Sequence, residues 1–152
     1  MAIQLITPFL WFDHQAEEAA SFYVSIFPNS SVVKVVRCGK AGPGPPGSAL
    51  TVEFQLGGQK FVALNGGPHF KFTEAISFVV SCNTQQEVDE YWAKLTPGGS
   101  EIQCGWLKDK FGLSWQIVPA QLPDLIKHPK ALQAMLKMKK LDIAELERAA
   151  KS

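Results

Sequence analysis

The alternation of apolar and polar residues predicts two copies of one order of elements. In the first copy, an apolar run over residues 5–12 predicts a strand covered on both faces, with Pro8 limiting its pairing. Apolar residues at helical spacing then predict a helix that begins at an Asp13 N-cap. Three strands follow, at residues 31–38, 49–56 and 60–65. Gly57-Gly58, between the last two strands, is typical of a hairpin turn.

The same order begins again about 70 residues later, as an internal repeat. Residues 75–82 are a predicted strand, and Thr84 with Glu87 forms a capping box that opens a helix. Two strands follow, at residues 101–107 and 114–119. The second copy therefore has one strand fewer than the first, unless residues 106–108 are counted separately.

The last predicted strand separates two kinds of side chain. Alternate residues of a strand lie on opposite faces, so Trp115 and Ile117 share an apolar face suited to pack under helices. Ser114 and Gln116 share the other face. A polar, uncharged side chain in the middle of such a strand faces solvent or lines a cavity, and we interpret this face as part of a cavity.

The residues after the second copy predict a helical extension. From Leu122 onward, apolar residues at helical spacing predict two short amphipathic helices that are broken near Leu141-Asp142. Their apolar stripes are too narrow to fold alone, so we expect them to pack on the body or on a second subunit. The predicted layout is a domain at 1–120, with modules at about 1–70 and 73–120, and an extension at 121–152.

Composition excludes several classes of function. Hydrophobic residues make up 46% and charged residues 19%, as in ordinary globular proteins. A net charge of +1 gives no electrostatic reason to expect nucleic acid or an anionic membrane as a partner. No apolar run approaches the roughly 20 residues that span a bilayer, and no signal peptide is evident. Three scattered cysteines predict reduced thiols in a cytoplasmic protein rather than disulfides or a zinc site.

Three motifs carry a family resemblance. They are Pro8–Asp13, Ala63–Pro68, and Gln103–Gly112 followed by Ser114-Trp115-Gln116. Together they resemble the PhnB-like branch of the vicinal oxygen chelate superfamily, a branch that often carries the label 3-demethylubiquinone-9 3-methyltransferase domain. The superfamily includes glyoxalase I, bleomycin and fosfomycin resistance proteins and extradiol dioxygenases. The resemblance covers nearly the whole chain. It implies an α+β fold in which two βαβββ modules form an open barrel of the glyoxalase/bleomycin-resistance type around a pocket, often completed by a homodimer.

In the metalloenzymes of that superfamily, inward residues of four strands bind a divalent ion. Imidazole and carboxylate groups suit this role because they hold the ion while leaving positions open for substrate. The matching positions here fall near Ile6, in 63–65, near Ser77 and at Gln116, where the metalloenzymes have Glu. None of these residues is a carboxylate or an imidazole. The resemblance therefore implies neither a tightly bound metal nor a cofactor.

Other catalytic chemistry finds little support in the sequence. A methyltransferase of the nucleotide-binding fold needs a glycine-rich turn that opens a helix, and neither Gly57-Gly58 nor Gly66-Gly67 does so. The three cysteines lie within predicted strands without a histidine nearby in sequence, which favours packing thiols. The segment 39–47, rich in glycine and proline, predicts an irregular surface loop. Of the histidines, His69 could overhang the mouth of a pocket.

The leading hypothesis is a metal-free protein that binds an unknown small molecule. Its predicted ligand-binding residues are aromatic, amide and hydroxyl side chains: Phe9, Trp11, Asn65, Ser77, Trp106 and Gln116. One alternative is a glyoxalase- or dioxygenase-type enzyme with a loosely held metal and ligands outside the usual set. The other is a dimeric assembly protein whose pocket has filled in. For each tryptophan, plain core packing also remains open.

Overall fold

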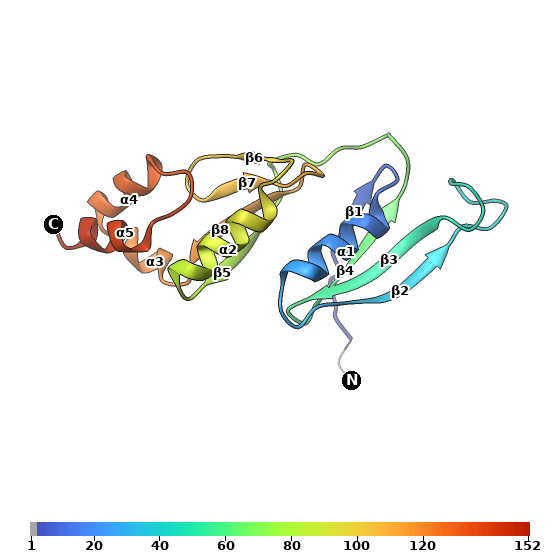
Figure 1. The fold of residues 1–152 in the computed structure, drawn as a ribbon, viewed down its shortest axis with the longest axis horizontal. Helices are drawn as coiled ribbons and strands as arrows, with labels where there is room; N and C mark the ends of the chain where they lie inside the picture. Colours follow the sequence, from blue (N-terminus) through green and yellow to red (C-terminus); the bar gives the residue numbers. More distant parts are fainter. Residues whose placement is uncertain (1–2) are drawn as a thin grey trace. The chain divides into compact units, whose positions relative to one another are not determined.

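The computed structural model describes residues 3–152 and divides the chain into two compact units, Met1–Lys71 and Phe72–Ser152 (Figure 1). The first unit contains β1 (Phe9–Phe12), α1 (Ala16–Ile26), β2 (Ser31–Arg37), β3 (Ala49–Leu56) and β4 (Gln59–Asn65). The second contains β5 (Ser77–Cys82), α2 (Gln85–Leu95), β6 (Ser100–Glu101), β7 (Trp106–Lys108), β8 (Ser114–Pro119), α3 (Leu122–Leu125), α4 (Pro129–Leu136) and α5 (Ile143–Ala150). The α+β class and the two βαβββ modules are confirmed. Among residues 3–152, no helix has the length and apolar character that crossing a bilayer requires.

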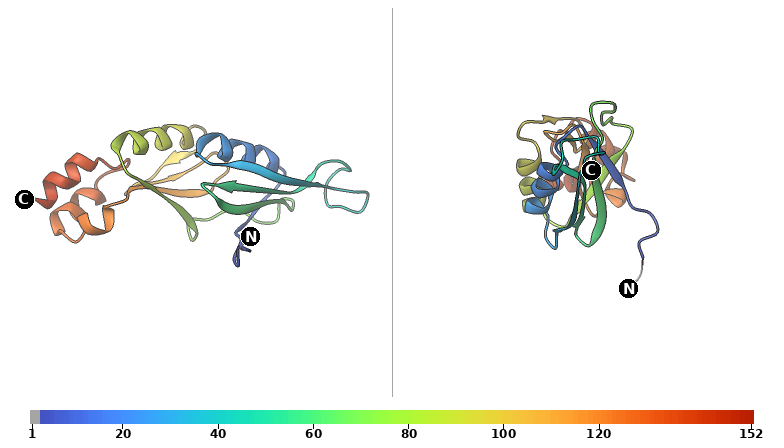
Figure 2. Two further views of the ribbon diagram at one scale, coloured as in Figure 1. Left: turned by 90° about the horizontal axis from the view of Figure 1, so that it is seen from below. Right: turned by 90° about the vertical axis from the view of Figure 1, so that its right-hand side faces the viewer.

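Each unit has its own mixed four-stranded sheet with a helix on one face (Figure 2). The strand order is β1-β4-β3-β2 in the first unit and β5-β8-β7-β6 in the second. The first strand of each module pairs in parallel with its last strand, and the remaining pairs are antiparallel. The repeat that the sequence predicts is therefore also a repeat of strand pairing.

The core of the first unit lies between α1 and its sheet. The helix buries Ala16, Ala19, Ala20 and Tyr23, as its spacing predicts, but the fifth buried residue is Ile26 and not the predicted Phe27, which is half-buried. The Tyr23 ring lies 6.2 Å from the Phe54 ring of β3, which in turn stacks on Phe61 of β4 at 5.5 Å. Aromatic pairs of this kind add stability beyond the area that they bury.

The start of α1 differs from the sequence prediction. Asp13 is not the N-cap; Gln15 occupies that position and makes no capping hydrogen bond with its side chain. The cap comes instead from β4, because the Ala16 N–H donates to Asn65 Oδ1 at 2.8 Å. Asn65 Nδ2 also donates to the Ala49 carbonyl of β3 at 3.0 Å. One amide side chain therefore ties α1 to two strands.

The first strand is shorter and more open than predicted. It spans Phe9–Phe12, and the side chains of Leu5 and Ile6 are 95% and 77% exposed. Only the face of Leu10 and Phe12 is buried, whereas Phe9 is 62% exposed. The prediction that this strand is covered on both faces is wrong. Its apolar residues gave no contrast between the two faces.

The predicted strand 101–107 is two strands separated by a turn. Cys104 and Gly105 have φ angles of 64° and 84°, in the left-handed region. Their N–H groups donate to the carbonyls of Met138 and Lys139, each at 2.8 Å. The turn gives the second module its fourth strand, and it depends on backbone acceptors from the C-terminal extension.

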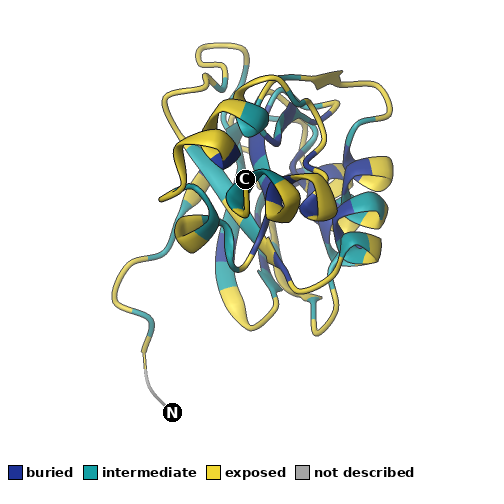
Figure 3. Cartoon of the chain, turned by 90° about the vertical axis from the view of Figure 1, so that its left-hand side faces the viewer, coloured by how far each residue is buried: buried dark blue, intermediate teal, exposed yellow. Residues whose placement is uncertain are grey.

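The second helix follows the sequence prediction. The Glu87 N–H donates to Thr84 Oγ1 at 3.1 Å, and Glu87 Oε2 accepts from the Asn83 N–H at 3.2 Å. The helix buries Val88, Trp92 and Leu95 against the sheet. Helices of the structure thus have a buried and an exposed side (Figure 3).

The C-terminal extension packs on the second unit of its own chain. The two predicted helices are α4 and α5, and the short α3 precedes them. Leu141 and Leu146 form a buried cluster with Val118 of β8. Gln85, at the start of α2, donates to the Leu141 carbonyl at 3.0 Å and accepts from the Ile143 N–H at 2.8 Å. The predicted homodimer is a separate matter and stays a prediction.

Replacement of Asn65 by Ala is expected to lower the free energy of unfolding by about 2 kcal/mol, because an N-cap acceptor and a strand contact are both lost. Asn65→Asp keeps an acceptor for the Ala16 N–H and should lose less. Asp13→Ala is the matched control and should change little, since Asp13 is not the cap. Urea denaturation checks the order of the three variants, and a large loss for Asp13→Ala would contradict it.

Stability is also expected to fall at alkaline pH because of Cys82. Burial, with a smaller effect of Glu87, raises the pKa of this thiol to about 11 from 9.0. A raised pKa in the folded state stabilises the fold below the unfolded pKa, and this contribution disappears as the pH rises from 9 toward 11. Cys82→Ala should show a shallower loss than wild type over that window in urea denaturation. Equal slopes would contradict the assignment.

Candidate functional site

The sheet face away from α2 carries a row of neutral polar groups. In the pairing of β8, Gln116 lies opposite Val79 of β5 and Trp106 of β7. Ser114 lies opposite Ser77 in the same way. Trp115 and Ile117 are buried on the other face, as the alternation predicts. The structure therefore brings three predicted ligand-binding residues, Ser77, Trp106 and Gln116, to one face of one sheet.

The hydrogen bonds of this row are incomplete. Gln116 Nε2 donates to Ser77 Oγ at 2.9 Å. The Ser114 Oγ is fully buried and has no hydrogen-bond partner among residues 3–152. A buried hydroxyl without a partner is uncommon and costs free energy. The row can therefore donate and accept hydrogen bonds while carrying no charge of its own.

A charged residue on this face, Lys108, is paired. Lys108 lies opposite Ser114 in the pairing of β7 with β8, and it forms an ion pair with Glu74. Ser114 was not among the predicted ligand-binding residues, although it shares a face with Gln116. The signal that could have found it is the same alternation that selected Gln116.

The hairpin before β8 is organised by Asp109. Its side chain is only 2% exposed, and Oδ1 accepts from the N–H groups of Phe111 at 2.8 Å and Leu113 at 3.1 Å. Its Oδ2 accepts from the Trp115 indole at 2.9 Å. Because Trp115 is held on the α2 face, Ser114 and Gln116 must lie on the opposite face.

In the first unit, Phe9 and Trp11 lie on the sheet face away from α1. The Trp11 indole donates to the Gly67 carbonyl at 2.9 Å, and its ring contacts Phe70 edge-on at 4.8 Å. A Cβ at Gly66 would lie 2.2 Å from the Trp11 ring, so only glycine fits there. Trp11 therefore packs against the 66–70 loop, which leaves the exposed Phe9 as the more accessible of the two rings.

Asn65 does not share the face of Phe9 and Trp11. It lies opposite Phe12 in the pairing of β1 with β4, and its side chain bonds to α1 and β3. Both faces of β4 are apolar before Asn65, so the alternation alone could not decide its side. Asn65 instead lines a cavity beside the start of α1.

No set of metal ligands converges in the described part of the chain. Within residues 3–152, no group of three or more His, Cys, Asp or Glu side chains could hold a metal ion. Ile6, near the first of the positions that the metalloenzymes use, is exposed and has no donor atom. The face of Gln116 offers hydroxyl and amide groups, which are weak ligands beside carboxylates and imidazoles.

The fold and the family match together define an α+β protein of the vicinal oxygen chelate superfamily. The family model described as 3-demethylubiquinone-9 3-methyltransferase matches residues 4–118. The chain belongs to that family, the PhnB-like branch of the superfamily. The comparison with curated proteins finds no match.

Solved structures agree with this assignment. A PhnB protein from Bacillus cereus, described as a 3-demethylubiquinone-9 3-methyltransferase, is 38% identical with a TM-score of 0.72, covering 77% of this chain and 100% of that chain. A protein from Pseudomonas aeruginosa is 19% identical with a TM-score of 0.64, covering 78% and 98%. A fosfomycin resistance protein from Listeria monocytogenes, complexed with Mn(II) and sulfate, is 15% identical with a TM-score of 0.56, covering 84% and 98%. The last two show the fold alone.

Replacement of Asp109 by Asn is expected to lower the free energy of unfolding by about 2 to 3 kcal/mol, since an amide accepts through one atom only and weakens charge-assisted bonds. The Trp115 indole N–H should lose its partner, which its side-chain NMR resonance would report. Asp124→Asn is the control, because Asp124 is exposed and forms an exposed ion pair with Lys127. A loss no larger than that of the control would contradict the role of Asp109.

Proposed function

We propose that the chain is a small-molecule-binding protein whose ligand lies on the sheet face of Ser77, Ser114 and Gln116, beside Trp106, with no tightly bound catalytic metal. The observation that carries the proposal is the buried Ser114 hydroxyl, which has no partner among the described residues. A ligand acceptor would remove that unfavourable state once the side chains that cover the hydroxyl move aside. Ligand sites commonly combine apolar walls with a few polar groups that fix orientation.

The chemistry of the face indicates a neutral ligand. Ser77 and Ser114 each have a hydroxyl hydrogen to donate, and Gln116 Oε1 can accept. Trp106 and Val79 flank Gln116 and supply apolar surface. Burial of apolar ligand atoms there contributes about 25 cal/mol per Å². The ligand we propose therefore has a donor, an acceptor and an apolar body. The assignment of Phe9 and Trp11, which lie on the sheet of the first unit, to a ligand site stays a prediction.

Two other functions have weaker support. A metal-dependent enzyme is suggested by the Mn(II) complex of the fosfomycin resistance protein, which shares only the fold. A methyltransferase of the nucleotide-binding fold would need a glycine-rich turn that opens a helix, and neither Gly57-Gly58 nor Gly66-Gly67 opens one. Gly57-Gly58 connects β3 to β4, and Gly66-Gly67 follows β4 in a loop. The homodimer and the cytoplasmic location stay predictions.

The proposal is tested by a thermal-shift screen of small quinones, lactones and 2-oxo aldehydes, followed by titration of the hits. At 100 times its dissociation constant, a ligand stabilises the fold by about 2.7 kcal/mol. Ser114→Ala should weaken binding about tenfold, because one hydrogen bond is lost, while leaving the ligand-free protein at least as stable. Gln116→Ala should weaken binding similarly.

Ser21→Ala, an exposed serine of α1 in the first unit, is the matched control and should leave affinity unchanged. Elemental analysis of the purified protein is the second arm. Stoichiometric zinc, nickel, iron or manganese that Gln116→Ala releases would overturn the proposal in favour of the metal-dependent enzyme. Unchanged affinity in both Ser114→Ala and Gln116→Ala would overturn the location of the site.

A further inference from the structure

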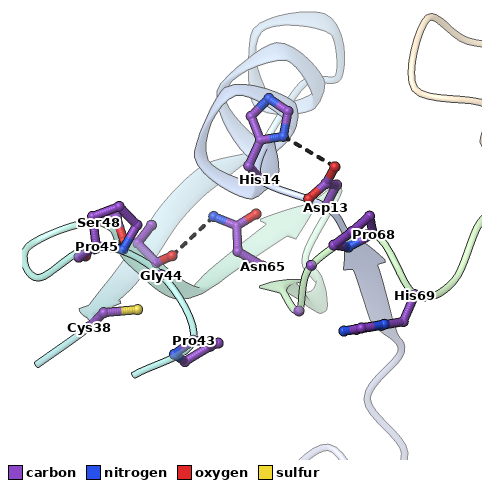
Figure 4. A pocket seen from close by; sticks show the side chains of 13 residues that line it. Asp13, His14, Cys38, Pro43, Gly44, Pro45, Ser48, Asn65, Pro68 and His69 are labelled. Carbon is purple, nitrogen blue, oxygen red and sulfur yellow. Dashed lines mark hydrogen bonds and ion pairs between the residues drawn. The ribbon is translucent and has the colours of Figure 1, made fainter. Parts of the chain in front are cut away.

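A separate cavity of about 380 Å³ lies within the first unit (Figure 4). Its walls come from the start of α1, from the glycine- and proline-rich loop between β2 and β3, and from the 66–69 loop after β4. All of its lining residues belong to the first unit, so it does not involve the row of Ser77, Ser114 and Gln116. A volume of this size holds a compact organic molecule.

The lining combines apolar surface with a nearly equal share of polar groups. The pyrrolidine rings of Pro43, Pro45 and Pro68 and the thiol of Cys38 contribute apolar surface. The imidazoles of His14 and His69 add flat rings that can also bond. The two imidazole planes suit stacking with a ring-shaped ligand.

The charge at the cavity is small. Neither lysine nor arginine is among the residues that line it. The carboxylate of Asp13 lies 3.6 Å from Nδ1 of His14, which partly offsets its charge when the imidazole is protonated. The cavity therefore has no fixed cation for an anionic ligand, and Asp13 disfavours one.

Asn65 offers a fixed donor at the cavity. Its Oδ1 accepts from Ala16 and one Nδ2 hydrogen is donated to Ala49, so both ends of the amide are held. The second Nδ2 hydrogen takes no part in these bonds. The Ser48 hydroxyl donates to the Pro45 carbonyl at 2.6 Å, which leaves its oxygen lone pairs to accept. A donor and an acceptor on rigid supports match an uncharged group that has both, such as a primary amide.

We propose that this cavity is a second small-molecule site, specific for an uncharged ring compound that carries an amide or a similar pair of donor and acceptor. Cys38 makes the site measurable. Its side chain is 6% exposed, yet it lines the cavity, so a small alkylating agent reaches it only through the cavity. Cys82 is fully buried and does not line the cavity, which makes it the internal reference.

The experiment measures alkylation of each cysteine by iodoacetamide in the full chain, using peptide mass spectrometry. Benzamide, benzoate and benzylamine are matched probes that differ in charge. Cys38 should react faster than Cys82, and benzamide at about ten times its dissociation constant should slow Cys38 about tenfold. Benzoate and benzylamine should protect at least tenfold less well at equal concentration. Benzamide should also shift the backbone NMR resonances of residues 43–48 and 66–69.

The glycines of the loop supply a filling variant and a matched control. A Cβ at Gly44 would lie 3.7 Å from Cys38 Sγ and 2.8 Å from Ser48 Oγ, so Gly44→Leu should block both alkylation and protection. A Cβ at Gly39 would meet nothing within 4 Å, so Gly39→Leu should behave as wild type. Should Gly44→Leu fail to fold, Ser48→Ala replaces it, with weaker benzamide protection expected and no slowing of alkylation without benzamide.

Three results would overturn the proposal. Cys38 reacting no faster than Cys82 would show that the cavity does not admit small molecules. Absence of protection by benzamide would reject the ligand class, as would stronger protection by benzoate or benzylamine. Alkylation of Cys38 in Gly44→Leu at the wild-type rate, or benzamide shifts of residues 43–48 and 66–69 that persist in that variant, would show that the cavity is not the site. None of these results affects the ligand binding measured with Ser114→Ala and Gln116→Ala. The two proposed sites are therefore tested independently.

Discussion

The carboxylate of Asp109 is the interaction on which the second unit depends. It binds two N–H groups of its own hairpin and the indole of Trp115, so it fixes both the turn and the side-chain direction of the strand that follows. A shift of one residue would exchange the two faces of a strand. Because Trp115 is held toward α2, the side chains of Ser114 and Gln116 must lie on the sheet face away from α2. A buried charge thus positions an uncharged site.

Much of the fold could be predicted because its signals are local. The repeat of apolar patterns, the Thr84 capping box and the Gly57-Gly58 hairpin each act within a few residues. The faces of β8 were also predictable, since Trp115 and Ile117 contrast strongly with Ser114 and Gln116. Local contrast in polarity was sufficient wherever only one face of an element is apolar.

The features that the sequence did not predict share a different cause, because they depend on contacts with distant parts of the chain. The capping hydrogen bond of α1 comes from Asn65, 49 residues from Ala16, so the prediction that the nearby Asp13 caps the helix was wrong. The turn at Cys104 and Gly105 is held by carbonyls of Met138 and Lys139. The side of Asn65 could not be read because β4 is apolar on both faces. The sequence pattern therefore did not predict that Asn65 bonds to α1 and β3 and lines a cavity.

The contacts of the C-terminal extension make it part of the second unit rather than an appendage. Met138, Lys139 and Leu141 supply backbone acceptors to residues that precede them by many positions. During synthesis, domains generally fold in order from the N-terminus. The first unit ends at Lys71, whereas the second includes the C-terminal helices and must wait for them to leave the ribosome. Translation that stops before residue 138 would therefore leave a finished first unit joined to an incomplete second one.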